Sequence, residues 1–131
     1  MMKIMVAYDR SNVAKAALDL AKQHAKAFDA KVYVITSMLG GRDVPREKFA
    51  NAERDLNYTE TLLKEKKIAC ETHLLIRGMS PGEDLVQFAK ENEIDVIIIG
   101  VKRRSKVGKF LLGSTAQYVI IKAPCPVVAV K

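Results

Sequence analysis

The amino-acid sequence predicts an α/β domain built on a five-stranded parallel sheet that is sandwiched by four helices. Five short apolar segments alternate with four amphipathic ones along the 131 residues, and this alternation is typical of parallel strands joined by helical crossovers. The fourth apolar segment, residues 96–99, contains no polar residue, as a strand buried on both faces requires. We expect a single domain over residues 1–131 with the strand order 3-2-1-4-5.

The first half of the chain contains two strand–helix units. Residues 3–8 predict the first strand, and Ser11 is a good N-cap for the helix that follows. Apolar residues at three- and four-residue spacing mark the inner face of this helix: Val13, Ala17, Leu18, Ala21, Ala25 and Phe28. Residues 31–38 predict the second strand. The second helix is expected to start near Pro45 and to end near residue 67.

The second half contains the remaining strands and helices. Residues 68–77 predict the third strand. Residues 80–83, Ser-Pro-Gly-Glu, begin a helix that ends near residue 92; the serine is expected to cap a backbone amide and the glutamate to reach back. After the fourth strand and a basic loop, residues 114–122 predict a short helix. Residues 127–130 predict the last strand, and the two prolines at its start suit the edge of a sheet.

Composition limits the classes of function. The net charge is +7, and five of the positive charges lie between residues 102 and 109. A charge concentrated in this way indicates a local anion site, or a solvated loop without a ligand. Nucleic acid is a less favoured partner, because few aromatic residues are available to stack on bases and none is interleaved with the basic loop.

The sequence also predicts the cellular compartment of the protein and the state of its two cysteines. No run of about 18 apolar residues is present, so we expect no membrane span. The N-terminal segment lacks the apolar core of a signal peptide, so we expect a cytoplasmic protein. Cys70 and Cys125 are too few for a zinc site, and the predicted sheet places them on opposite edges as buried thiols. Neither His24 nor His73 has partners at metal-ligand spacing, so no metal site is assigned.

A binding site is expected where the strand order reverses. Ligands of parallel α/β sheets bind beyond the carboxyl ends of the strands at such a point, and Asp9 and Gly100 follow strands one and four. Gly113, Ser114 and Thr115 begin the next helix, and free amides at a helix N-terminus favour phosphate. Each polar residue also has a simpler role. Asp9 could bond its own backbone in a turn, and Ser114 could be only a helix cap.

The spacing of these residues resembles the signature of the universal stress proteins. Two residues separate Gly100 from Arg103, and nine residues separate Arg103 from Gly113-Ser114. The resemblance covers the whole chain, including the first strand that ends at Asp9, the helix start at Ser80 and the closing APCPVVAVK. It implies a Rossmann-like fold of the adenine nucleotide alpha hydrolase type.

The resemblance implies a nucleotide that lies across the ends of strands one and four. Ala7 and Asp9 would then lie near the adenine and ribose, and the backbone of Ser37 would contact the base. The ribose and phosphates would be held by Gly100, Gly113, Ser114 and Thr115. The implied ligand is ATP or a related adenine nucleotide, with Mg²⁺ as a candidate companion ion.

One residue departs from the family pattern. Arg103 stands where the ATP-binding branch has its second glycine, and an arginine there could clash with the phosphates or close the pocket. Alternatively, Arg103 and its neighbours Lys102, Arg104 and Lys106 could bind the phosphates by charge-assisted hydrogen bonds. Two other interpretations therefore stay open: a structural or protein-interaction relative with a blocked pocket, and a nucleic-acid binder that uses residues 102–109.

The leading hypothesis is a nucleotide-binding module for stress response or signalling, with an unidentified protein partner. No catalytic residue is assigned, and without a clear general base any ATP hydrolysis or self-phosphorylation would be slow. The last strand, within residues 126–130, is flat and apolar, and such an edge is an aggregation hazard unless it is paired. We therefore expect a homodimer in which the two copies of this strand pair antiparallel, as the family resemblance also implies.

Overall fold

The computed structural model describes residues 1–101 and 112–131, and in this part of the chain five strands alternate with four helices. Their order confirms the expected sequence of elements. The bounds are β1 (Lys3–Ala7), α1 (Asn12–Phe28), β2 (Lys31–Ser37), α2 (Arg46–Glu65), β3 (Cys70–Leu75), α3 (Pro81–Glu91), β4 (Val96–Gly100), α4 (Ser114–Lys122) and β5 (Val127–Val130).

The strands form one parallel sheet in the order β3-β2-β1-β4-β5, as predicted. The central strand β1 pairs with both β2 and β4, so that Met5 lies between Tyr33 and Ile97. The middle residues of β1 have no exposed surface, which explains why their sequence is uniformly apolar. The order reverses between β1 and β4, and the carboxyl ends of these two strands therefore flank a crevice.

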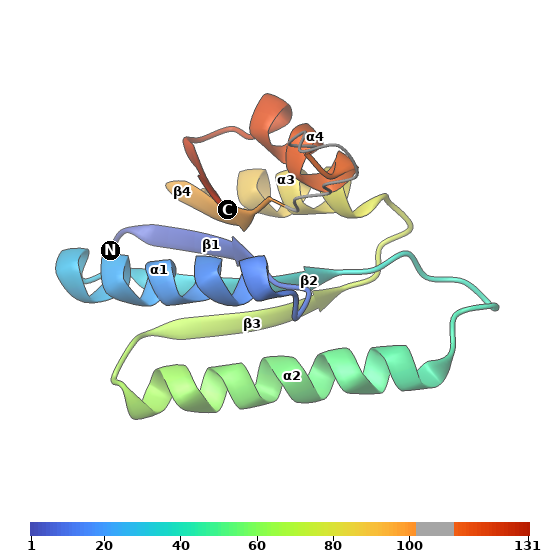
Figure 1. Cartoon of the computed structure of the whole chain (residues 1–131), viewed down its shortest axis with the longest axis horizontal. Helices are drawn as coiled ribbons and strands as arrows, with labels where there is room; N and C mark the ends of the chain where they lie inside the picture. The colour runs from blue at the N-terminus through green and yellow to red at the C-terminus, as the bar shows by residue number, and fades with distance from the viewer. Residues whose placement is uncertain (102–111) are drawn as a thin grey trace.

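Helices cover both faces of the sheet and create two apolar cores. On one face, α1 and α2 pack on a cluster that includes Ile4, Val34 and Ile98. On the other face, α3 and α4 pack on a cluster that includes Met5 and Ile99. Figure 1 shows α2 alongside β3 and the α3–α4 pair on the opposite side of the molecule. The helices thus hold the strand ends of β1 and β4 in fixed positions.

Helix α1 follows the prediction except at its last residue. The Ala14 amide donates to Ser11 Oγ at 3.2 Å, so Ser11 is the N-cap as expected. In the predicted stripe Val13 is half-buried and the next four residues are buried, but Phe28 is 61% exposed, and its prediction as a core residue is wrong. Phe28 lies in the final turn, beside the starts of the strands, where the sheet offers no surface to cover it.

The start of α3 differs in detail from the predicted capping box. Ser80 is the N-cap and Pro81 the first helical residue, as expected, but no side chain caps a backbone amide. Instead, the Ser80 hydroxyl donates to Glu83 Oε1 at 2.8 Å. The two side chains that were expected to bond the backbone bond each other, and the prediction of reciprocal capping is wrong.

The two cysteines lie at opposite edges of the sheet, Cys70 in β3 and Cys125 just before β5, and both are free thiols. They are half-buried rather than fully buried. Burial is the largest effect on both and raises the pKa of each thiol above its usual value, so both thiols are protonated at neutral pH. Within residues 1–101 and 112–131, no helix has the length and apolarity that crossing a bilayer requires.

Candidate functional site

A cavity of about 310 Å³ lies at the carboxyl ends of β1 and β4, at the predicted position. Seven of the predicted site residues line it: Ala7, Asp9, Ser37, Gly100, Gly113, Ser114 and Thr115. Residues from the first third of the chain thus meet residues from its last quarter. The remaining predicted residue, Arg103, lies outside the described residues, and so does the basic loop around it.

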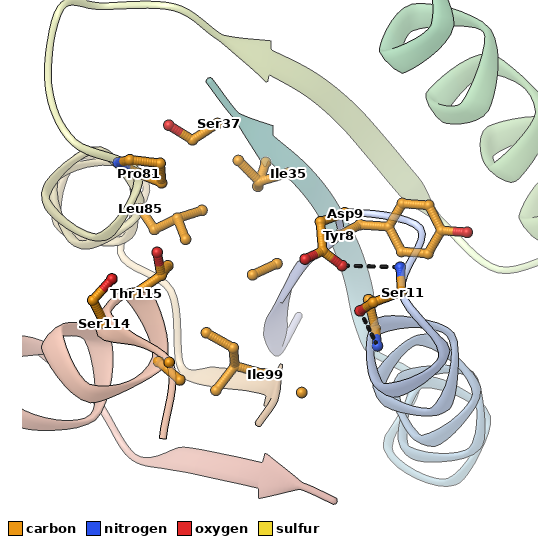
Figure 2. Close-up of a pocket in the computed structure, with 15 residues that line it drawn as sticks. Tyr8, Asp9, Ser11, Ile35, Ser37, Pro81, Leu85, Ile99, Ser114 and Thr115 are labelled. Atoms are coloured by element: carbon orange, nitrogen blue, oxygen red, sulfur yellow. Dashed lines mark hydrogen bonds between the residues drawn. The ribbon is translucent and has the colours of Figure 1, made fainter. Parts of the chain in front are cut away.

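The cavity has two polar walls that face each other. Figure 2 shows Asp9 and Ser11 on one side, Ser114 and Thr115 on the other, and the side chains of Ile35, Leu85 and Ile99 between them. A ligand that fits this shape has an apolar middle and hydrogen-bonding groups at two ends, as small-molecule sites commonly require.

Asp9 is held by a network at the end of β1. The Ser11 amide donates to Asp9 Oδ1 at 3.0 Å, and the neighbouring Tyr8 amide donates to the Ile35 carbonyl at 2.9 Å. Thr36 Oγ1 donates to the Tyr8 carbonyl at 2.7 Å. The turn contact that competed with a binding role is therefore present. It also fixes the carboxylate at the cavity edge, where it can accept a hydrogen bond from a ligand hydroxyl.

The two glycines of the predicted motif have different structural roles. A Cβ on Gly100 would lie 2.6 Å from the Val13 carbonyl carbon, so this glycine is required by the close packing of β4 against α1. Among residues 1–101 and 112–131, no atom lies within 4 Å of a Cβ built on Gly113. Gly113 therefore leaves open space at the cavity wall, and this space is available to a ligand.

The N-terminus of α4 forms the wall opposite Asp9. The N-cap is Gly113, and no side chain caps this end of the helix. Ser114 is the first helical residue, so the interpretation of Ser114 as a helix cap is wrong. The first turn contains no acidic residue, and its amides, together with the Ser114 and Thr115 hydroxyls, are suited to a phosphate.

The apolar part of the cavity was missed by the sequence prediction. Pro81 and Leu85 line it from α3, one helical turn apart and therefore on the same face of the helix. With Ile35, they form a surface on which a flat ring can rest (Figure 2). The available signal was the start of α3 at Ser80, because the helix that follows β3 begins at the carboxyl edge of the sheet.

A second missed feature is a buried charged pair behind Ser37. Asp84 in the first turn of α3 has no exposed surface. Its Oδ1 accepts from Arg77 Nε at 2.6 Å, and its Oδ2 accepts from Ser37 Oγ at 3.0 Å. This network could not be recognised in the sequence, because the buried carboxylate of Asp84 looks the same there as the exposed charges of α3.

A neighbouring cavity of about 340 Å³ shares Tyr8, Asp9 and Ser37 with the first. It lies toward α2, where Arg10 Nε and Asp55 Oδ2 form an ion pair at 3.0 Å. Burial, and secondarily the Asp55 carboxylate, raises the pKa of the Tyr8 hydroxyl, so Tyr8 is neutral at physiological pH. Among residues 1–101 and 112–131, no group of three or more His, Cys, Asp or Glu side chains could hold a metal ion.

Comparison with known proteins identifies relatives that match along the full chain. The universal stress protein family model matches residues 1–131. A universal stress protein of Thermus aquaticus is 34% identical over 134 residues, which cover 98% of this chain and 97% of that protein.

Solved structures agree in fold as well as in sequence. A universal stress protein from Archaeoglobus fulgidus has a TM-score of 0.90 and 36% identity, and the match covers 100% of this chain and 99% of that one. A structure of the universal stress protein from the same organism in complex with dAMP has a TM-score of 0.84 and 33% identity, over 100% and 98% of the two chains. The chain described here belongs to the universal stress protein family.

Proposed function

We propose that this protein binds an adenine nucleotide, ATP or a related one, in the cavity between β1 and β4. The observation that supports this most strongly is the meeting of Asp9, Ser37 and the α4 N-terminus around one cavity of about 310 Å³. The similar structure from Archaeoglobus fulgidus, 33% identical over the whole chain, was determined with dAMP.

The proposed pose follows from the chemistry of the walls. The adenine ring rests against Ile35, Pro81 and Leu85, the apolar part of the lining. The ribose hydroxyls donate to the Asp9 carboxylate. The phosphates lie at the N-terminus of α4, where amide groups, hydroxyls and the helix dipole favour an anion. If Mg²⁺ accompanies the nucleotide, phosphate oxygens and water would supply its ligands.

We further propose a binding module, in which nucleotide occupancy changes the conformations that a partner protein meets. On the phosphate side, the described lining offers hydroxyls and amides, which hold a phosphate but are poor general bases at neutral pH. The Asp9 carboxylate lies on the opposite wall (Figure 2). Any hydrolysis or self-phosphorylation is therefore expected to be slow.

The outer edge of β5 supports a proposed homodimer. β5 is the last strand in the sheet order and its sequence, VVAV, is apolar. An apolar edge strand invites pairing with another chain, and two copies related by a two-fold axis satisfy each other. In the proposed dimer the two β5 strands pair antiparallel and form one continuous sheet.

Mass spectrometry of freshly purified, denatured protein tests the proposed ligand without prior choice of the nucleotide. We expect an adenine nucleotide to be released, or to bind in calorimetric titration when ATP, ADP and AMP are added to the empty protein. Absence of binding by all three nucleotides would favour the interaction protein with a blocked pocket. Binding of random DNA or RNA that weakens steeply with salt would favour the basic loop as a nucleic-acid site.

A further inference from the structure

At the end of β2, the protein itself determines whether the cavity wall offers a ligand a hydrogen-bond donor or an acceptor. Ser37, the last residue of β2, lines the cavity and lies beside Pro81 at the start of α3 (Figure 2). Its hydroxyl donates to Asp84 Oδ2 at 3.0 Å. A serine hydroxyl has one hydrogen to donate and two lone pairs that accept, so this contact uses its only donor.

Asp84 is held so firmly that the direction of this hydrogen bond cannot reverse. Arg77, which has donors only, contacts Asp84 through Nε to Oδ1 at 2.6 Å and through Nη2 to the Asp84 carbonyl at 3.2 Å. Arg77 Nη1 also donates to Glu91 Oε1 at 2.8 Å. A carboxylate paired with a guanidinium offers only acceptors, and the hydrogen between Asp84 and Ser37 must therefore come from Ser37.

We propose that Ser37 is a specificity-determining residue, which selects a base carrying an exocyclic amino group over one carrying a carbonyl oxygen at the same position. The inference rests on the proposed nucleotide site and names the part of the ligand that is read there. Because its hydrogen is used by Asp84, Ser37 Oγ has only lone pairs left for a ligand in the cavity that this residue lines. The 6-amino group of adenine can donate to them, whereas the 6-carbonyl oxygen of hypoxanthine or guanine would place acceptor against acceptor.

Asp84 and Arg77 are positioning residues in this scheme, because they act on the ligand through Ser37. An uncompensated charge with no exposed surface is costly, and Asp84 is stabilised by Arg77 and by its place in the first turn of α3, where the helix dipole favours a carboxylate. A purely structural link between β2 and α3 would make no distinction between bases. The two roles therefore differ in a measurable quantity, the ratio of affinities for two matched nucleotides.

The matched pair of probes is AMP and inosine 5′-monophosphate, which carry an amino group and a carbonyl at position 6. For the wild-type protein, we expect titration calorimetry to give AMP the tighter binding by about tenfold, the scale of one hydrogen bond. Ser37→Ala removes the acceptor, and the ratio of the two affinities should fall toward one. As a matched loss of a hydroxyl, Ser114→Ala should weaken both nucleotides equally and leave the ratio unchanged.

The variant Asp84→Asn should change the ratio of the two affinities in a way that a purely structural role of Asp84 would not produce. Arg77 Nε, a donor, holds the amide oxygen of the new side chain, which turns the amide NH₂ toward Ser37. The Ser37 hydroxyl then accepts from that NH₂, and its own hydrogen is released for the cavity. We expect the preference to move toward inosine 5′-monophosphate, with a ratio at or below one. Thermal melting confirms that the variant is folded, and Ser37→Ala decides the question if it is not.

The outcomes separate this inference from the proposed function. If wild-type protein binds neither nucleotide, the proposed function fails, and the inference fails with it. If AMP binds but Ser37→Ala keeps the wild-type ratio, the inference alone is overturned, and backbone groups are responsible for the discrimination. A falling ratio in Ser37→Ala together with a constant ratio in Ser114→Ala supports it.

Discussion

The Val13 backbone at the start of α1 occupies the space that a side chain on Gly100 would need, with 2.6 Å between the Val13 carbonyl carbon and the position of a Cβ. This contact joins the end of β4 to the first turn of α1. We therefore expect Gly100→Ala to destabilise the fold by about 1–3 kcal/mol, the usual cost of overpacking. Urea denaturation measures it, and an unchanged midpoint would show that α1 moves away freely.

Gly113 should respond in the opposite way. In the part of the chain that the structure describes, no atom lies within 4 Å of a Cβ at this position, and the backbone angles, φ −64° and ψ 153°, suit any residue. We expect Gly113→Val to lower the melting temperature only slightly, because valine is a weaker N-cap than glycine, and to lower nucleotide affinity at least about tenfold, because the side chain enters the space of the phosphate. Calorimetric titration measures the affinity. Unaltered binding would place the phosphates elsewhere.

These two glycines show how far the sequence could predict the site. Their spacing indicated a common site, and both line the cavity, but spacing alone could not separate a glycine required by packing from one that leaves open space. The apolar continuity of β4 correctly predicted an interior place in the sheet, between β1 and β5. The burial of Asp84 could not be predicted, since it depends on how α3 packs beside β2 and on the hydrogen bonds that Asp84 accepts from Ser37 and Arg77.

Helix ends were the least predictable part of the fold. Phe28 has the right spacing for the buried face of α1 but lies beyond the surface that the sheet provides. Ser80 and Glu83 have the right spacing for a capping box, yet they bond each other. In both cases the pattern gives the direction of a side chain, while the neighbouring elements decide what it meets. The role of Arg103 stays a prediction, because it lies outside the described residues.

The outer edge of β5 can be tested without disturbing its inner edge. Pro126 and Val130 accept hydrogen bonds from Ile97 and Val101 of the β4 segment, so in a parallel ladder the alternate residue Ala129 directs its amide outward. We expect Ala129→Pro, which removes that outward donor, to convert a dimer into a folded monomer. Light scattering and circular dichroism measure the two properties. A dimer of unchanged affinity would place the interface elsewhere.

Glu71 should contribute to the stability of the protein against acid. Hydrogen bonds from Lys31 and then from His73 hold the pKa of the Glu71 carboxyl below its usual value of 4.5. A lowered pKa in the folded state gives stability that is present above pH 4.5 and is lost as the pH falls through the folded-state pKa. We expect Glu71→Gln to lower the melting temperature modestly at pH 7, because the side chain is half-exposed, and the difference to disappear once the pH lies below the folded-state pKa.

The matched control for this pH series is Glu53→Gln, a change at an exposed position of α2. Its melting temperature should follow that of the wild type more closely than Glu71→Gln does at neutral pH. A Glu71 variant that parallels the wild type from pH 7 to pH 3 would contradict the assignment. The Lys31 and His73 contacts would then contribute nothing to the pH dependence.

The most direct test of the nucleotide site is a crystal structure of the protein grown with excess AMP. We predict density for the base against Ile35, Pro81 and Leu85, for the ribose at Asp9, and for the phosphate at the N-terminus of α4. An empty or collapsed cavity, or one filled by the Arg103 side chain, would contradict this prediction and leave a universal stress protein whose function does not depend on a nucleotide.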